Sequence, residues 1–466
     1  MTTVEAATLE EKTQTARWKT SRYTRLIPVG MGEGVLYNGL TAALIQLSSE
    51  AFDRAQKVFE KRELTLDEIG LQDPLFEHYV AGGFVVEEQF DELALVKKEY
   101  EEKRRDSKFV ITILPTYSCN LGCDYCFVSK KTGVMSRSKQ DEVIRFVSER
   151  LEVVKPPRMI VDWFGGEPTL ALSAMQYLSK AFLELAQKHD IPYYAQVITN
   201  GTRINAETAD LMADCGINHL QVTLDGPKEI HDERRGYKAA AGSSFDAIID
   251  GLEHVVGRFR IDLRINVDVR NMEATWPLLD LFEERGWLRE DNEFYPHLAR
   301  VAPYTEECAW VGDITSQQAA FHEYNFKWMQ RLAQNKVPVV GHGLYHFPDR
   351  VYYNCGAVGE NSFLITPAGE LHRCGLVTDD SREKVGNLSQ QLDEMNTNYR
   401  KWREFSPFDD KHCSDCSYLP SCLGGCPHDQ MNPEKKYGRE SSCVFHKKFE
   451  DKIIAQHIQL LQQMDV

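Results

Sequence analysis

The sequence lacks any apolar run long enough to cross a membrane, and residues 1–20 lack the apolar centre of a signal peptide. It also lacks an excess of positive charge, because 54 Lys and Arg stand against 70 Asp and Glu, for a net charge of −16. Nucleic acid and anionic membrane surfaces are therefore excluded as expected main partners. These absences predict a cytoplasmic protein.

Cysteine, by contrast, is plentiful, with twelve residues in a chain of 466. In a reducing compartment such cysteines are better interpreted as metal ligands than as disulfides. Cys119, Cys123 and Cys126 share one short loop directly after residues 109–114, an apolar β-branched run that predicts a buried strand. Three thiolates form an incomplete ligand set, so an iron–sulfur cluster held here would keep one iron open. On spacing alone, a zinc loop with its fourth ligand elsewhere is the alternative.

Strands and helices alternate from residue 109 to about residue 301. This alternation predicts six βα units and a parallel sheet whose functional side chains lie at the carboxyl ends of the strands. The predicted strands are residues 109–114, 159–163, 194–199, 219–224, 263–269 and 294–298. The predicted helices are residues 138–153, 173–188, 206–215, 244–256 and 276–285.

Polar or glycine-rich motifs follow several of these strands. Two glycines allow close backbone approach, and small polar groups at strand ends suit a ribose or a carboxylate. Ordinary turns and helix caps are the alternative interpretation. The motif residues are Gly165, Gly166, Glu167 and Pro168, then Thr199 and Asn200, then Thr223, Asp225 and Arg235, and more weakly Asn266 and Asp268.

Seven further cysteines lie in the last quarter of the chain, and their spacing is highly regular. The first two are separated by thirteen residues, then a glycine (Gly369), then four further residues. A zinc ribbon would explain the Cys-x2-Cys half taken alone. The seven are Cys355, Cys374, Cys413, Cys416, Cys422, Cys426 and Cys443.

On these motifs, residues 108–450 resemble the radical S-adenosylmethionine (SAM) enzymes that carry a SPASM domain. The resemblance implies an α/β fold, a partial (β/α)6 barrel of radical SAM type. It also implies a [4Fe–4S] cluster on Cys119, Cys123 and Cys126, whose open iron binds SAM. Reduction of that cluster would release a 5′-deoxyadenosyl radical.

The same resemblance implies roles for the other motif residues. Two auxiliary [4Fe–4S] clusters would be held by Cys355, Cys374 and Cys426, and by Cys413, Cys416, Cys422 and Cys443, making three clusters in all. Cys308 would be the fourth ligand of the first auxiliary cluster, a reactive thiol near the substrate, or inert; Cys215 is expected to be a buried apolar residue. The SAM-binding residues would be Tyr125, Phe127, Gly165, Gly166, Glu167, Pro168, Thr199, Asn200, Thr223, Asp225, Arg235 and Asn266.

The remaining segments complete the predicted domain organisation. An N-terminal region of strands and small helices resembles the winged-helix domain that binds leader peptides by strand addition, and a plain packing domain is the alternative. A charged helix at its end is expected to be a solvated linker. The predicted domains are a flexible leader (1–20), a winged-helix-like α+β domain with the linker helix (21–106), the radical SAM core (107–305), a bridging segment (306–350), the SPASM domain (351–450) and a C-terminal helix (451–466).

Many SPASM enzymes modify peptides, so the resemblance implies maturation of a ribosomally made precursor peptide through crosslinking, epimerisation, excision or oxidation. The first alternative is an anaerobic sulfatase-maturating enzyme, although Gly375 stands where that group carries an Asp. The second is a non-catalytic scaffold that binds peptide and holds clusters or zinc. The expected partners are the precursor peptide, an electron donor such as flavodoxin or ferredoxin, and, if the N-terminal domain does not bind the leader, a separate peptide-recognition protein.

Overall fold

Six apolar, β-branched stretches form strands that pair with one another in chain order, all parallel. They are β7 (Phe109–Ile113), β8 (Met159–Trp163), β9 (Tyr193–Thr199), β10 (Ile217–Thr223), β11 (Arg260–Val267) and β12 (Phe294–Arg300). The computed structural model describes residues 17–59, 63–64, 74–105, 108–128, 131–239, 242–334, 350–353, 355–378, 380–391, 395–432, 443 and 445–464. The α/β parallel sheet predicted from the sequence is confirmed.

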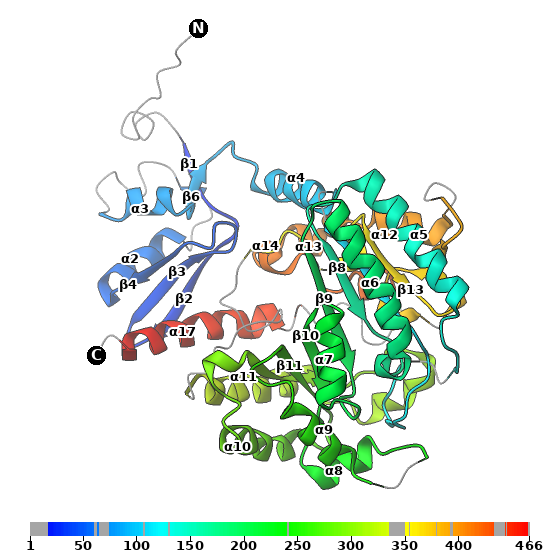
Figure 1. Cartoon of the computed structure of the whole chain (residues 1–466). Helices are drawn as coiled ribbons and strands as arrows, with labels where there is room; N and C mark the ends of the chain where they lie inside the picture. The colour runs from blue at the N-terminus through cyan, green and yellow to red at the C-terminus, as the bar shows by residue number, and fades with distance from the viewer. Residues whose placement is uncertain are drawn as a thin grey trace.

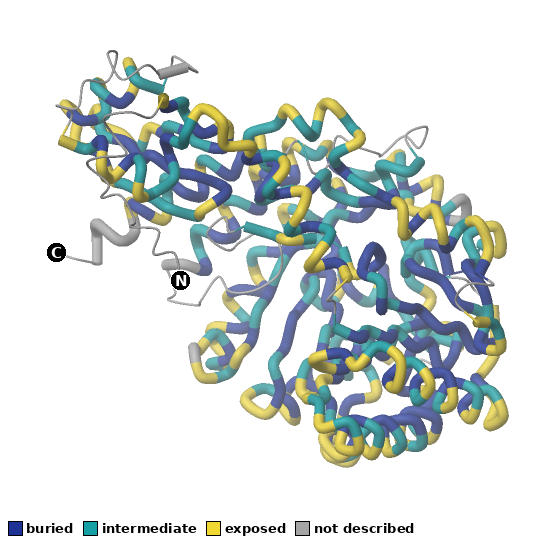
Figure 2. The backbone as a smooth tube through the Cα atoms, turned by 90° about the horizontal axis from the view of Figure 1, so that it is seen from above, coloured by how far each residue is buried: buried dark blue, intermediate teal, exposed yellow. Residues whose placement is uncertain are grey.

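Helices cover the outer face of this sheet, as Figure 1 shows for α5, α6 and α7. Each buries one apolar stripe; α6, for example, places Met175, Leu178 and Phe182 in the core with Val161 and Trp163 of β8. In Figure 2, buried residues run along the strands and exposed residues gather on the outer helices and loops. The helices are α5 (Arg137–Val154), α6 (Leu172–Lys188), α7 (Ala206–Asp214), α8 (Lys228–Arg234), α9 (Ser244–Leu252), α10 (Trp276–Glu284) and α11 (Gln318–Gln334).

The cysteine-rich tail continues the same sheet. β13 (Ser362–Ile365) pairs parallel to β7, and β14 (Glu370–His372) and β15 (Gly386–Asn387) follow antiparallel, which makes nine strands. Because β7 pairs with β13 and not with β12, the six core strands do not close on themselves. Short helices then complete the tail: α12 (Thr397–Glu404), α13 (Lys411–Ser414), α14 (Leu419–Cys422), α15 (Pro427–Met431) and α17 (Asp451–Met464).

Two small antiparallel sheets form the N-terminal region. One contains β2 (Thr24–Gly30), β3 (Glu33–Asn38) and β4 (Leu44–Leu47), with α2 (Ser49–Phe59) beside it. The other contains β1 (Trp18–Thr20), β5 (Glu63–Leu64) and β6 (Val85–Glu87), which α3 (Phe76–Ala81) contacts. β1 corrects the leader predicted over residues 1–20, since Trp18 packs in the core against Phe76; residues 1–16 lie outside the described part.

The charged helix α4 (Glu92–Arg105) is not a solvated linker. Val96, Tyr100 and Arg104 recur every four residues and are buried, so the helix presents a packed stripe to the tail. The Tyr100 hydroxyl and the Arg104 guanidinium donate to the Phe405 carbonyl at 3.3 and 3.2 Å. The prediction failed because many charged residues surround this stripe.

The C-terminal helix returns to the N-terminal region. α17 packs against β2, and Ile454 and Ile458 join Ile27, Val35 and Tyr37 in one buried cluster. Figure 1 shows α17 running alongside β2. Among the described residues, no helix combines the length and apolar composition that crossing a membrane requires.

Candidate active site and cysteine clusters

The loop that carries Cys119, Cys123 and Cys126 begins shortly after the carboxyl end of β7. Backbone hydrogen bonds fix it to the segment that follows α8; the Gly122 N–H, for example, donates to the Gly236 carbonyl at 2.9 Å. The loop therefore lies over the open end of the sheet, between the ends of its strands.

The three thiols of this loop share one neighbourhood. Burial raises the pKa of Cys123 to about 12, and the nearby thiolates of Cys126 and Cys119 add to this effect. A bound cation would reverse the shift, because metal ligation requires the deprotonated thiolates. In the described residues no three histidine, cysteine or carboxylate side chains already stand at metal-ligand positions, so the structure gives proximity and not a finished coordination geometry.

The Gly-Gly-Glu-Pro motif packs directly against the start of this loop. The Gly166 N–H donates to the Thr116 carbonyl at 3.1 Å. A Cβ on Gly166 would lie 2.3 Å from the Ser118 carbonyl oxygen, and one on Gly165, where φ is 124°, would lie 2.5 Å from the Thr116 oxygen. The close approach of the cysteine-loop backbone therefore requires glycine at both positions. This packing explains the two glycines without a bound ligand.

Gly166→Ala is expected to displace the cysteine loop, because the clashing atoms are backbone atoms that cannot rotate away. We expect about a 100-fold lower rate of SAM cleavage, since a displacement of about 1 Å at a reacting centre costs that much. The measurement is deoxyadenosine formation, with iron content measured in parallel. Gly122→Ala is the matched control on the same loop, because its Cβ would meet Lys238 at 3.5 Å and the Gly236 carbonyl oxygen at 3.8 Å, both ordinary contacts. Equal rates for both variants would contradict this interpretation.

Glu167 is fully buried, and its carboxylate is already saturated by the protein. It accepts from the Thr169 N–H at 3.0 Å, the Thr169 hydroxyl at 2.6 Å, the Thr199 hydroxyl at 2.8 Å and the Asn200 N–H at 2.7 Å. These bonds join the motif to the end of β9. We therefore interpret Glu167 as a positioning residue, although the sequence predicted a ligand contact.

Asn200 connects the end of β9 to the cysteine loop. Its side-chain amide donates to the Asn120 side-chain oxygen at 2.9 Å and to the Cys119 sulfur at 3.6 Å. An amide donor to a thiolate stabilises its charged form. Asn200 and Cys119, predicted separately from two motifs, are thus direct neighbours.

Four predicted SAM-binding residues form a single hydrogen-bonded node. The Tyr125 hydroxyl donates to the Asp225 carboxylate and accepts from the Arg235 guanidinium at 2.5 Å and the Asn266 amide at 3.1 Å. The other oxygen of Asp225 accepts from the Asn266 N–H at 3.0 Å. The node ties the cysteine loop to the ends of β10 and β11.

The sequence did not single out Arg234, which completes this node. Its guanidinium pairs with Asp268 at 2.7 Å and with Asp225 at 3.7 Å, and it lies 5.1 Å from the Tyr125 ring centre. Only its position next to Arg235, a predicted SAM-binding residue, could have indicated Arg234 from the sequence. Both arginines are buried, which sequence alone did not indicate.

Three predicted SAM-binding residues remain: Thr223, Phe127 and Pro168. Thr223 ends β10, and within the described residues its hydroxyl has no protein hydrogen-bond partner, so it keeps capacity for a ligand. Phe127 packs edge-to-face on Tyr304 with ring centres 5.7 Å apart. Pro168 begins the short 3-10 helix η1 (Pro168–Ala171) and is buried.

The seven tail cysteines form two neighbourhoods. Burial raises the pKa of Cys374 to about 12, with contributions from Cys355 and Cys426. Burial likewise raises the pKa of Cys422 to about 12, and here the contributing thiolates are Cys443, Cys413 and Cys416. This is the division that the resemblance implies, and ligation of a cluster by each set stays a prediction.

Cys308 lies beside the active-site loop. It is buried in the 3-10 helix η4 (Glu306–Asp313), where its sulfur accepts from the Thr305 N–H at 3.4 Å. Its apolar neighbours include Tyr125 and Phe127, and this cluster contains none of the auxiliary cysteines. This placement favours a role beside the active-site loop, as a reactive thiol or as a structural residue, over ligation of the first auxiliary cluster. Cys215 follows α7 and is buried in the main core, as expected.

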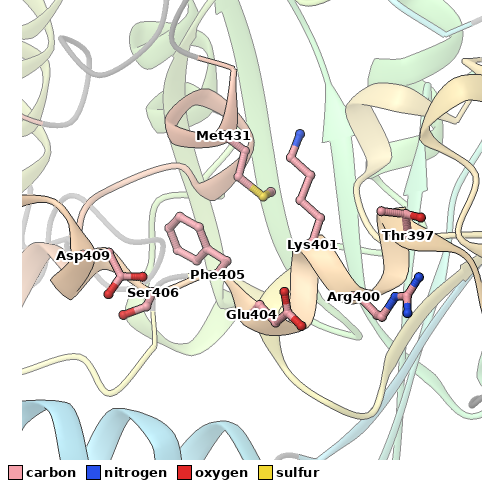
Figure 3. Close-up of a pocket in the computed structure, with 8 residues that line it drawn as sticks. All are labelled: Thr397, Arg400, Lys401, Glu404, Phe405, Ser406, Asp409 and Met431. Atoms are coloured by element: carbon pink, nitrogen blue, oxygen red, sulfur yellow. The ribbon is translucent and has the colours of Figure 1, made fainter.

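A surface pocket of about 560 Å³ lies on the tail (Figure 3), and no residue of the node lines it. Phe405 and Met431 form its apolar part, and charged side chains of α12 surround it. Met431 ends α15, which begins directly after Cys426.

Comparison with known proteins agrees with this geometry. Residues 113–282 match the Radical SAM superfamily. The chain is 27% identical over 346 residues to a mycofactocin maturase of Mycobacterium ulcerans (70% of this chain, 85% of that protein). It is 22% identical over 356 residues to a serine-type anaerobic sulfatase-maturating enzyme of Bacteroides thetaiotaomicron (67% and 81%).

The fold is also shared over nearly the full chain. The crystal structure of Streptococcus suis SuiB bound to precursor peptide SuiA covers 91% of this chain and 99% of its own, with a TM-score of 0.53 and 16% identity. The parallel sheet, the three-thiol loop at its open end and the matched superfamily point to one conclusion. Residues 113–282 therefore form a radical SAM domain, and such a domain implies a [4Fe–4S] cluster and SAM.

Proposed function

We propose that this chain is a radical SAM/SPASM enzyme that modifies a ribosomally made precursor peptide. The observation that carries the proposal is the division of ten cysteines into three separate neighbourhoods, one at the sheet opening and two in the tail. Such a division suits three [4Fe–4S] clusters. The relatives that mature mycofactocin and the fold likeness to SuiB with its precursor peptide support a peptide substrate.

A reduced [4Fe–4S] cluster with SAM supplies a deoxyadenosyl radical that abstracts hydrogen from an unactivated carbon. The residues of this chain would prepare the site for that chemistry. Cys119, Cys123 and Cys126 would hold the cluster, while Glu167 and the node around Asp225 fix the loop in position. Thr223 would donate a hydrogen bond to the SAM carboxylate.

Delivery of the peptide would use the N-terminal region. β2 and β4 are the edge strands of their sheet, and among the described residues each pairs on one side only. An extended leader peptide adds to such an edge through main-chain hydrogen bonds. A separate peptide-recognition protein would replace this step if the edge does not bind peptide, and flavodoxin or ferredoxin would supply the electrons.

Sulfatase maturation is the second candidate, supported by the sulfatase-maturating relative. That reaction oxidises a Cys or Ser side chain to formylglycine and needs a base. Gly375 occupies the position after the second tail cysteine, where that group carries an Asp. This difference favours the precursor-peptide proposal.

The test is to reconstitute the protein anaerobically and measure iron, sulfide and deoxyadenosine after reduction with dithionite and SAM. We expect about twelve irons per chain and deoxyadenosine formation. Incubation with the peptide from a small neighbouring reading frame, and separately with a sulfatase-motif peptide, followed by mass spectrometry, distinguishes the two candidates. Zinc in place of iron, with SAM intact, would leave only the scaffold alternative.

A further inference from the structure

Arg373, next to Cys374, is a buried cation with unusual surroundings. Its side chain is only 5% exposed. The guanidinium donates to three main-chain carbonyls, those of Ala357 (2.9 Å), Gly359 and Ser362. These three residues follow Cys355, so Arg373 fixes the segment that begins at Cys355. Arg373 itself directly precedes Cys374 in the chain.

Arg373 has no carboxylate partner among the described residues. Two aromatic rings lie near it, Phe363 at 5.5 Å and Tyr399 at 5.7 Å. A buried guanidinium that lacks a counter-charge is strongly unfavourable, and protonated thiols would supply none.

We infer that Arg373 is the counter-charge of an iron–sulfur cluster held by Cys355, Cys374 and Cys426. Thiolate ligands outnumber the positive charge of a [4Fe–4S] core, so the bound cluster is an anion and can neutralise this cation. The guanidinium in turn stabilises the more negative, reduced cluster and raises its reduction potential. Arg373 is therefore a positioning and tuning residue, and this role rests on the proposed function only in taking the group to be an iron–sulfur cluster.

The test compares Arg373→Met with Arg373→Lys, which keeps the charge and loses the fork of three carbonyl bonds. Both are made in protein whose Cys119, Cys123 and Cys126 are replaced by Ala, so that only the tail clusters remain. The readouts are iron and sulfide content and a redox titration followed by electron paramagnetic resonance. The signal absent after Cys374→Ala identifies the cluster in question. Arg403→Met is the control, because Arg403 lies at a similar 5.9 Å from Tyr399 but on the surface.

We expect Arg373→Met to lose about four irons per chain, or to keep them with that one signal shifted to more negative potential. Arg373→Lys should retain the iron, and its cluster should have a reduction potential closer to that of the protein with Arg373. Arg403→Met should change neither the iron content nor the potential. Unchanged iron and potential in Arg373→Met would overturn the inference. If Arg373→Met does not fold, Arg373→Lys decides, because loss of the cluster despite the retained charge would overturn it too. Absence of iron and sulfide before any substitution would instead refute the proposed function.

Discussion

Replacing Cys119, Cys123 and Cys126 together by Ala should abolish deoxyadenosine formation while the tail clusters persist. The three thiols lie at the open end of the sheet, and the tail thiols form two other neighbourhoods. No thiol is shared between them, so the loss should be about four irons per chain out of about twelve. Iron analysis and chromatography of deoxyadenosine measure both effects.

The matched control is Cys215→Ala, a buried cysteine in the main core that belongs to none of the three neighbourhoods. Its iron content and rate should match those of the original protein. Loss of all iron in the triple variant would mean that the tail clusters need the core cluster for assembly. Retention of all the iron would show that the ligand assignment is wrong.

The strands of the core could be predicted because each is a short apolar run bounded by turn residues. The motifs at their carboxyl ends were located correctly, since parallel strands bring those ends together. What these residues do there was not predictable to the same degree. Glu167 and Asp225 have polar side chains that could meet a ligand, yet the structure surrounds both with protein donors. Such saturation depends on contacts between residues up to 100 positions apart.

Long-range pairing also explains the features that the sequence did not indicate. β13 extends the core sheet although its residues lie 252 positions after their partners in β7 (Ser362 pairs with Val110), and no local pattern encodes that pairing. α4 was expected to be solvated because charge dominates its composition, whereas Val96 and Tyr100 bury against the tail. Cys308 was predicted to be a ligand, a reactive thiol or an inert residue, and its packing beside Tyr125 could be found only in three dimensions.

Arg25→Met should release the N-terminal sheet from the tail and weaken the second tail neighbourhood. Arg25 lies on β2, is 8% exposed, and pairs with Glu450, which is 1% exposed, and with Asp451 at 2.9 Å. Its guanidinium also lies 4.1 Å from the Tyr418 ring centre. Removing one partner leaves a buried carboxylate without its cation, which costs about 3–5 kcal/mol. Hydrogen exchange of β2 and iron content are the measurements.

The link to the cysteines runs through the other partners of Glu450. Its carboxylate accepts from the Ser421 hydroxyl at 3.0 Å and pairs with His446. Ser421 precedes Cys422, and His446 lies three residues after Cys443, so one buried acid connects β2 to two predicted ligands. Faster exchange in β2 and lower iron content should therefore appear in the same variant.

A double-mutant cycle isolates this pair from general damage. Glu450→Gln alone should also lower the stability of the fold. The double variant, Arg25→Met with Glu450→Gln, should cost less than the sum of the two single variants, because it removes both members of the buried pair together. Arg17→Met is the control, since its contact with Glu88 at 3.9 Å is exposed and should contribute about 0–1 kcal/mol. Additive losses would mean that Arg25 acts through its packing on Tyr418 alone. Coupled losses would show that one buried ion pair stabilises both the N-terminal sheet that contains β2 and the tail loops that carry Cys422 and Cys443.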